Sequence, residues 1–312
     1  MKTPRFSVLI PTYNRRQLLA QAIDSVLAQT FPDYEIIVID DGSIDGTVTM
    51  LQSYGSHIRV LSQENRGGQV ARSQGAAIAA GDYLVLLDDD DVLYPDALAI
   101  YDRIIRAEEA PPLIVGAMSY FRDGETPTAN PAGDEGIMFL RFRDYLSKDV
   151  GFGKSNSRIV VKRSMAEATG ALRAVPPPFP CDDINLLLLM GTKGPFVFIQ
   201  RPYTVAYREH DSNTLKRVDY IVEGCLKLAR FERHGKYPGG RSRRFNRYAC
   251  IGGGCSVFTY RALKQGRLQL ASKLLLRTAP MIAAAVINKL GRYFRKPTPL
   301  NRLPAQLAIL NG

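Results

Sequence analysis

The fold is decided by residues 83–91, whose sequence is YLVLLDDDD. Five residues without charge make a run that suits a buried strand, and four consecutive aspartates end it. Two earlier segments are similar: residues 6–10 are followed by Pro11, and residues 35–40 are followed by Asp41-Gly42-Ser43. We therefore expect three buried strands, each of which stops abruptly at a turn or a polar cluster.

Helical segments separate these strands. Residues 16–29, 45–54 and 67–80 have helical spacing, and residues 58–61 form a further short strand pattern. Such alternation with short connectors is typical of an α/β fold with a parallel sheet. Ligands bind at the carboxyl ends of the strands in such sheets, and both acidic clusters lie at such ends. This placement is the first indication of function.

The later part of the chain has weaker patterns. We expect strands at 114–118 and 158–161, irregular connections at 123–136 and 176–178, a helix at 183–190 and basic helices from about residue 217.

The acidic run at 88–91 has two interpretations. Four adjacent like charges repel one another and need cations, donors or solvent. Mg²⁺ and Mn²⁺ prefer carboxylate oxygens and leave positions for phosphate oxygens, so a metal site is one interpretation. The other is a solvated turn in which Asp91 caps a helix at 92–104.

The acidic cluster at 40–47 leaves two interpretations open as well. Ser43 or Asp45 could cap the following helix. A carboxylate at this strand end could instead accept a hydrogen bond from N3–H of a uracil ring.

The charge is unevenly distributed along the 312 residues. Residues 216–312 hold 20 Lys and Arg against three acidic residues, whereas residues 1–215 hold 21 against 27. This asymmetry predicts that the two parts have different partners. The four cysteines lack zinc-site spacing and are too few for a disulfide scaffold, which favours a reducing, cytoplasmic setting. We expect neither a secretory signal nor a segment that spans a membrane.

A basic amphipathic helix is predicted at residues 281–296. Ile282, Val286, Ile287, Leu290 and Phe294 share one side, and Lys289, Arg292, Arg295 and Lys296 share the other. The helix could lie on an anionic membrane surface or pack its apolar side against the rest of the protein. We expect no nucleic-acid partner, because no recognition motif is present and the acidic site would repel phosphates.

Five motifs occur in order: SVLIPTYNR at 7–15, SVLAQT at 25–30, DDGS at 40–43, GDY at 81–83 and LDDDD at 87–91. Together they resemble the family 2 glycosyltransferases. The resemblance covers about residues 6–215. It implies the GT-A fold, a nucleotide-binding α/β sandwich with a mixed, mostly parallel sheet, in a catalytic domain at 1–215. Residues 216–312 would form a helical C-terminal extension.

The resemblance also implies roles for individual residues. Asp41 would meet the base, and Asp88-x-Asp90 resembles the metal-ligand motif with Asp90 as the direct ligand. His210 would reach the diphosphate or the metal, unless it is merely structural. Arg72 would lie near the nucleotide sugar, unless it is a surface cation. Nucleotide-binding residues would be Pro11, Thr12, Tyr13, Arg15, Asp41, Arg72, Asp88 and Asp89, and metal-binding residues would be Asp88, Asp90 and His210.

The segment CDDINL at 181–186 resembles the acidic pair of the family at the start of a helix. By that resemblance Asp183 is the catalytic base, and Asp182 replaces a glutamate. The alternative for Asp182 is that it merely caps the helix.

The implied function is that of an inverting hexosyltransferase that uses Mn²⁺ or Mg²⁺. It would move a sugar from a nucleoside diphosphate sugar, with UDP as the default, to a hydroxyl of a lipid-linked or cell-envelope polysaccharide precursor. The enzyme would be cytoplasmic, with peripheral attachment to the inner face of the cell membrane left open. Two alternatives are a nucleotidyltransferase, which would usually show a glycine-rich phosphate loop, and an inactive nucleotide-sugar-binding or scaffold protein with the same fold.

Overall fold

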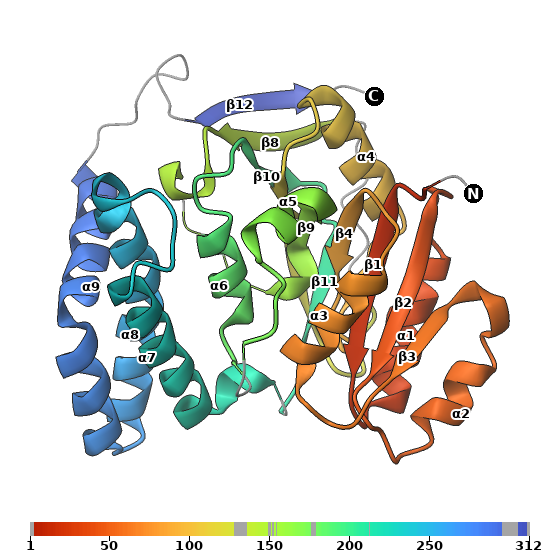
Figure 1. Cartoon of the computed structure of the whole chain (residues 1–312), viewed down its shortest axis with the longest axis horizontal. Helices are drawn as coiled ribbons and strands as arrows, with labels where there is room; N and C mark the ends of the chain where they lie inside the picture. Colours follow the sequence, from red (N-terminus) through yellow and green to blue (C-terminus); the bar gives the residue numbers. More distant parts are fainter. Residues whose placement is uncertain are drawn as a thin grey trace.

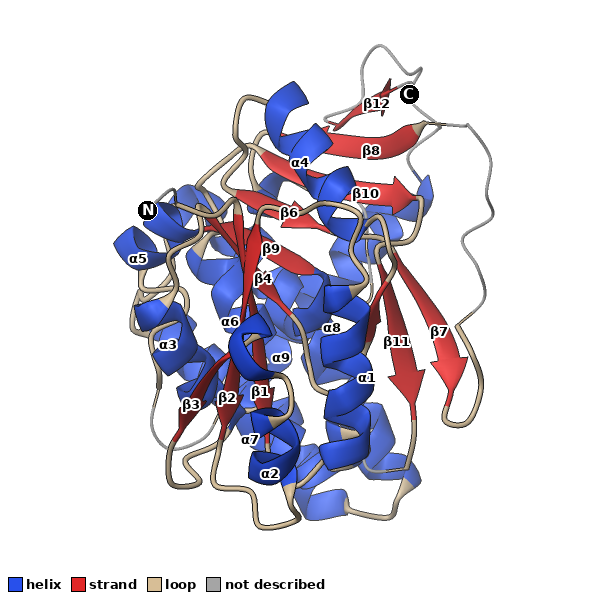
Figure 2. Cartoon of the chain, turned by 90° about the vertical axis from the view of Figure 1, so that its right-hand side faces the viewer, coloured by secondary structure: helices blue, strands red, loops and turns tan. Residues whose placement is uncertain are grey.

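The computed structural model describes residues 3–127, 136–148, 151, 153, 155–175, 179–211, 213–294 and 305–310. In these residues the main sheet has nine strands in the order β12-β8-β10-β6-β9-β4-β1-β2-β3 (Figure 2). The strands of the main sheet are β1 (Phe6–Thr12), β2 (Tyr34–Asp40), β3 (Arg59–Ser62), β4 (Tyr83–Leu86), β6 (Leu113–Val115), β8 (Ile137–Phe142), β9 (Ile159–Lys162), β10 (Phe196–Arg201) and β12 (Ala305–Leu310). A smaller sheet contains β5 (Val92–Leu93), β11 (Val205–Glu209) and β7 (Met118–Arg122).

Helices cover the main sheet and extend beyond one end of it (Figure 1). They are α1 (Arg16–Leu27), α2 (Thr47–Gln52), α3 (Gly68–Ile78), α4 (Ala97–Ala107), α5 (Arg163–Thr169), α6 (Asp182–Leu189), α7 (Val218–Arg233), α8 (Arg244–Lys264) and α9 (Leu268–Phe294).

The central strands are apolar on both faces, which confirms the prediction of buried strands. Val8 and Ile10 of β1 belong to one buried cluster, while Leu9 belongs to the other. β2 follows the same rule, with Val38 on one face and Ile39 on the other. Strands that are covered by helices on both faces consist of successive apolar residues, instead of alternating apolar and polar residues.

The main sheet is mixed, as predicted. β1 pairs in parallel with β2 and β4, β2 with β3, and β10 with β6. The antiparallel strand β9 lies between β4 and β6, and β8 is antiparallel to both β10 and β12. Seven of the nine strands in the described residues therefore run in one direction.

Two predicted elements near the acidic run are wrong. The strand predicted at 114–118 is two strands in different sheets, because β6 ends at Val115 and β7 begins at Met118. Gly116 lies at the break, where a Cβ would overlap Thr204. The helix predicted from residue 92 begins only at Ala97, after the short strand β5. Most of the loop predicted at 123–136 and all of 176–178 lie outside the described residues.

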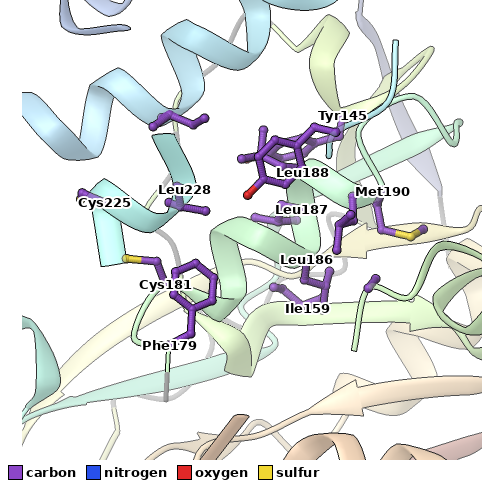
Figure 3. Packing of buried hydrophobic residues seen from close by; sticks show 14 of the residues in the cluster. Tyr145, Ile159, Phe179, Cys181, Leu186, Leu187, Leu188, Met190, Cys225 and Leu228 are labelled. Carbon is purple, nitrogen blue, oxygen red and sulfur yellow. The ribbon is translucent and has the colours of Figure 1, made fainter. Parts of the chain in front are cut away.

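The C-terminal helices share a core with the sheet. Val222 and Leu228 of α7 belong to the same buried cluster as Leu187 of α6 and Leu9 of β1. Figure 3 shows α6 side chains facing those of α7, with Cys181 and Cys225 at one side. The chain then returns to the sheet, where β12 pairs with β8 (Figure 1).

Helix α9 is apolar on two faces. Leu274 and Met281 are buried, whereas Leu276, Val286 and Ile287 are 80%, 48% and 58% exposed. Its stretch Leu268–Gly291 is long and apolar enough to cross a membrane by length and composition alone, and most of its residues are not buried. Lysines and arginines interrupt this stretch, and the expectation that no segment spans a membrane rested on runs without a charged residue; this helix does not test it. Of the predicted amphipathic set, Arg295 and Lys296 and the side chains of Arg292 and Phe294 lie outside the described residues.

Candidate functional site

A cavity of about 750 Å³ opens at the carboxyl ends of β1, β2 and β4. All eight residues predicted at the nucleotide line it, together with Asp90 and Asp183. These side chains come from five separate regions of the sequence, and the fold brings them around one space. Among the predicted site residues, only His210 does not line the cavity, but its Nε2 lies 2.9 Å from Oδ2 of Asp90, which does.

The Asp41 carboxylate holds the loop that leads into α3. Its Oδ1 accepts hydrogen bonds from Gln63 Nε2 at 2.7 Å and from the Arg66 N–H at 2.9 Å, and its Oδ2 accepts one from the Gly67 N–H at 2.7 Å. A carboxylate has about four lone-pair positions, so these three bonds leave one on Oδ2. Gly42 follows with φ +86°, which lets the chain turn sharply at this strand end.

The four aspartates after β4 have different environments. Thr12 Oγ1 donates to Asp89 at 2.7 Å, and Arg15 Nη1 donates to Asp89 at 3.0 Å and to Asp90 at 2.6 Å. Asp89 and Asp90 therefore lie against the end of β1, in direct contact with it. Because Arg15 bonds to both carboxylates, it partly neutralises the acidic run.

Asp91 is buried and does not cap a helix, so the capping interpretation is wrong for this residue. It is 1% exposed, and its carboxylate accepts hydrogen bonds from Ser157 Oγ at 2.5 Å and from the Arg208 N–H at 2.9 Å. The N-cap position of α4 is Asp96, which makes no side-chain cap bond. Asp91 thus anchors the acidic run to two distant segments.

Burial and crowding change the acidity of the run. Burial raises the pKa of Asp88, raises that of Asp89 to about 6, and raises that of Asp91 well above its ordinary value. Burial would also raise the pKa of Asp90, but hydrogen bonding to His210 and the charge of Arg15 hold it below its ordinary value. Asp90 is therefore the member of the run that most strongly favours the ionised form.

Arg72 is not a surface cation. Its side chain is 11% exposed, and its guanidinium bonds to Asp88 through Nη2 and to Asp182 through Nη1. Burial would lower the pKa of Arg72, but the charges of Asp182 and Asp88 raise it further above its ordinary value. The guanidinium therefore connects the acidic run to the start of α6.

The acidic pair of α6 occupies its first turn. Asp182 Oδ1 accepts a hydrogen bond from Asn156 Nδ2 at 3.3 Å, in addition to the Arg72 pair, so Asp182 does more than cap the helix. Asp183 Oδ1 accepts a hydrogen bond from the Ile184 N–H at 2.6 Å. Carboxylates are favoured at this end of a helix by its dipole. Asp183 lines the cavity and is half-buried.

A cation could be held beside Asp90. His210 Nε2 lies 2.9 Å from Asp90 Oδ2 at the end of β11. Within the described residues no three His, Cys, Asp or Glu side chains converge in a way that could hold a metal ion. Asp90 and His210 thus offer two ligands. The other ligands of a bound ion would come from phosphate oxygens or water, as is usual for Mg²⁺.

Two parts of the site were not predicted from the sequence. Arg208 is 3% exposed and supports the acidic run by donating to the Asp90 carbonyl oxygen at 2.9 Å. The far wall of the cavity is formed by α7 and α8, including Tyr220 and Gly253. The only local signals were the position of Arg208 beside His210 and the run of three glycines at 252–254.

Comparisons with known proteins show what the chain is similar to. The model of the family described as Glycosyl transferase family 2 matches residues 7–169. Glycosyltransferase GlyG of Streptococcus pneumoniae is 28% identical over 156 residues, which are 48% of this chain and 52% of that protein. Chondroitin synthase of Escherichia coli is 37% identical over 102 residues, 32% of this chain and 15% of that one. The chain therefore spans about half the length of these curated relatives, or less.

A solved structure shares the fold over nearly the whole chain. The crystal structure of S. aureus TarS 1–349 has a TM-score of 0.56 and 13% sequence identity, and it covers 99% of this chain and 97% of that one. The similarity confirms the GT-A fold that the motifs predicted.

Proposed function

Because this chain belongs to glycosyl transferase family 2, we propose that it transfers a sugar from a nucleoside diphosphate sugar to an acceptor hydroxyl. One observation carries the proposal: Asp41, Asp90 and Asp183 line one cavity although they lie far apart in the sequence. A base-binding carboxylate, an acidic diphosphate site and a general base are the groups that this reaction requires.

The donor half of the cavity suits a uridine nucleotide. The lone-pair position left on Asp41 Oδ2 can accept the N3–H of uracil, and Tyr13, which is 44% exposed, offers a ring at the mouth. S. aureus TarS, which shares the fold, has been solved with UDP-GlcNAc and with UDP. We take a UDP-sugar as the donor.

Asp90 and His210 would hold Mn²⁺ or Mg²⁺, with Asp88 beside them. Asp90 and His210 suit a divalent cation because they offer a carboxylate with a lowered pKa and an imidazole in contact with it. When bound, a divalent cation supplies positive charge to the departing diphosphate. Arg15 adds fixed positive charge at Asp89 and Asp90, and Arg72 adds it at Asp88.

Asp183 would act as the general base. It would take the proton of the acceptor hydroxyl as the hydroxyl oxygen bonds to the anomeric carbon and the bond from that carbon to the diphosphate breaks. Attack from the face opposite the leaving group inverts the anomeric centre. The ion pair between Arg72 and Asp182 keeps the neighbouring carboxylate occupied, so that Asp183 is the carboxylate of this pair that receives the proton.

We divide the chain into a catalytic domain at 1–215 and a basic extension at 216–312. The extension would bring the enzyme to its acceptor. The exposed apolar face of α9 includes Leu276 and Ile287, and an anionic membrane surface would suit it. The acceptor would then be a lipid-linked or cell-envelope saccharide precursor at the cytoplasmic face of the membrane.

The test is a screen of nucleoside diphosphate sugars against the purified chain, with and without Mn²⁺. Release of UDP from one UDP-sugar, stimulated by the metal, supports the proposal. An inactive binding protein would bind UDP-sugars without releasing UDP, and a nucleotidyltransferase would release pyrophosphate from a nucleoside triphosphate. Either outcome would refute the proposed transfer.

A further inference from the structure

The cavity has a second half that faces away from the nucleotide end. Its wall includes Arg217, Tyr220 and Ile221 around α7, and Gly253, Val257 and Arg261 of α8. These residues lie beyond the segment 7–169 that the family model matches, so family membership does not assign them a role. Asp183 lines the same cavity, which leaves this half as the space from which an acceptor can reach it.

Three consecutive glycines of α8 give this wall its shape. At Gly252 a Cβ would overlap the main chain at Met281, so this glycine lets α8 and α9 pack closely. At Gly253 a Cβ would meet nothing within 4 Å, and at Gly254 it would meet only Cys225 Sγ at 3.9 Å. Glycine inside a helix costs roughly 1 kcal/mol relative to alanine. Packing against α9 explains Gly252, whereas Gly253 and Gly254 line the cavity and leave its wall without side chains there.

The charge of this half is opposite to that of the donor half. Arg217 and Arg261 are exposed at its edge, and no carboxylate of the described residues forms an ion pair with either one. The Arg217 guanidinium lies 4.8 Å from the Tyr220 ring centroid, and that of Arg261 lies 5.1 Å from the Phe258 ring centroid. Aromatic contacts thus position two arginines whose charge is not neutralised by the protein.

The surface between these arginines is mainly apolar. Ile221 and Phe258 are buried, and Val257 is 48% exposed at the mouth. The wall residues from 214 to 261 that line the cavity include no Asp or Glu. Guanidinium groups bind phosphate through two parallel hydrogen bonds. The apolar surface beside the two arginines would cover a hydrocarbon group.

We propose that this half of the cavity binds the acceptor, and that the acceptor carries a phosphate group attached to an apolar chain. Arg217 and Arg261 bind the phosphate, and Ile221, Val257 and the open face at Gly253 receive the group next to it. The inference rests on the proposed function, since it places the acceptor relative to Asp183, but it can fail while that function stands.

The test measures binding of geranyl phosphate to the full chain while UDP and Mn²⁺ saturate the donor half. Geraniol and glycerol phosphate are the comparison ligands, because each lacks one of the two features. We expect geranyl phosphate to bind roughly tenfold or more tightly than either ligand. Equal binding of glycerol phosphate would overturn the apolar part of the inference, and equal binding of geraniol would overturn the phosphate part.

Variants locate the site. Arg217→Gln and Arg261→Gln should each weaken geranyl phosphate binding roughly tenfold, because each removes a charge-assisted bond. Arg244→Gln is the matched control, since Arg244 is an exposed arginine of α8 that does not line the cavity. Gly253→Phe should also weaken the binding, because its ring fills the open space; a thermal melt checks that α8 stays folded.

Two results separate the two proposals. If UDP binds and UDP-sugar is hydrolysed, but the two arginine variants bind geranyl phosphate as the unaltered protein does, the acceptor inference is wrong and the proposed function stands. If no UDP-sugar binds, the proposed function itself fails.

Discussion

Arg72 of α3 and Asp182 of α6 form an ion pair inside the cavity, although 110 positions separate them in the sequence. The same guanidinium bonds to Asp88 at the end of β4. One buried cation therefore fixes the distance between the acidic run and the first turn of α6. Since Asp183 is the next residue in that turn, the ion pair also positions the proposed base.

Replacing Arg72 with methionine should lower both stability and transfer. Arg72→Met leaves Asp88 and Asp182 without their counterion, and breaking a buried pair in this way costs roughly 3–5 kcal/mol. Urea unfolding and kcat measure the two losses. Asp182→Asn in the same chain should restore part of the stability, because one unpaired charge is removed. Strictly additive effects of the two changes would show that the pair is not coupled.

Asp183→Asn should leave donor binding almost unchanged and slow the transfer. General base catalysis contributes about 10²- to 10⁴-fold, so kcat should fall within that range. Calorimetry with UDP measures the first effect, and single-turnover transfer measures the second. Glu223→Gln is the control, because Glu223 is an exposed carboxylate of α7. Asn185→Asp is unsuitable, because Asn185 is buried. A mutant with near-normal kcat would remove Asp183 from the mechanism.

Activity should depend on a divalent cation through Asp90 and His210. Chelation by EDTA should abolish donor hydrolysis, and added Mn²⁺ should restore it. Asp90→Asn and His210→Gln should raise the Mn²⁺ concentration for half-maximal rate by roughly 10- to 100-fold, since the two side chains lie in contact at 2.9 Å. Full activity in EDTA, or an unchanged Mn²⁺ requirement in both variants, would exclude the proposed metal site.

The sequence predicted the elements whose structure depends on a single segment. β1, β2 and β4 are apolar on both faces, so their composition predicts buried strands without knowledge of any partner. β7 and β11 were not predicted. β11 pairs with β7 from a distant part of the chain, and its residues, such as Arg208 and Glu209, do not make an apolar run.

The same distinction applies to the site, where local features were predicted and contacts between distant segments were not. The strand-end aspartates were predicted because the ends of neighbouring strands meet in any such sheet. The interpretation of Asp91 as a helix cap was wrong. Its partners Ser157 and Arg208 lie 66 and 117 positions away in the sequence, and local capping rules cannot identify them. The wall at Gly253 was missed because a glycine run inside a helix does not show which neighbour it faces.

The exposed face of α9 should bind anionic vesicles. Leu276 and Ile287 are 80% and 58% exposed, and their burial in a lipid surface would contribute about 1.5–3 kcal/mol each. Leu276→Gln combined with Ile287→Gln should therefore reduce co-sedimentation with phosphatidylglycerol vesicles by tenfold or more. Higher salt should weaken the binding of the unaltered chain, because Arg277 is exposed next to Leu276 in the helix. Equal sedimentation of both proteins would show that α9 does not form the contact.

Glu35 should make the stability of the sheet depend on pH. Its Oε1 accepts hydrogen bonds from Ser7 Oγ at 2.6 Å and from the Ala80 N–H at 2.7 Å, and its Oε2 accepts one from Arg59 Nη1 at 2.6 Å. Burial would raise the pKa of Glu35, but these bonds lower it below the ordinary value of 4.5. The ionised carboxylate therefore joins β2 to β1, to β3 and to the end of α3.

A carboxyl with a lowered pKa in the folded state stabilises the protein above its unfolded pKa, and this contribution is lost as the pH falls through the folded pKa. Glu35→Gln should thus reduce the free energy of unfolding by about 1 kcal/mol near neutral pH. The difference between the two proteins should shrink as the pH falls below 4.5, the ordinary value for this carboxyl. Urea unfolding at several pH values measures it, with the exposed Glu64→Gln as the control. A difference that stays constant with pH would mean that the charge of Glu35 contributes nothing, and that only the shape of its hydrogen bonds matters.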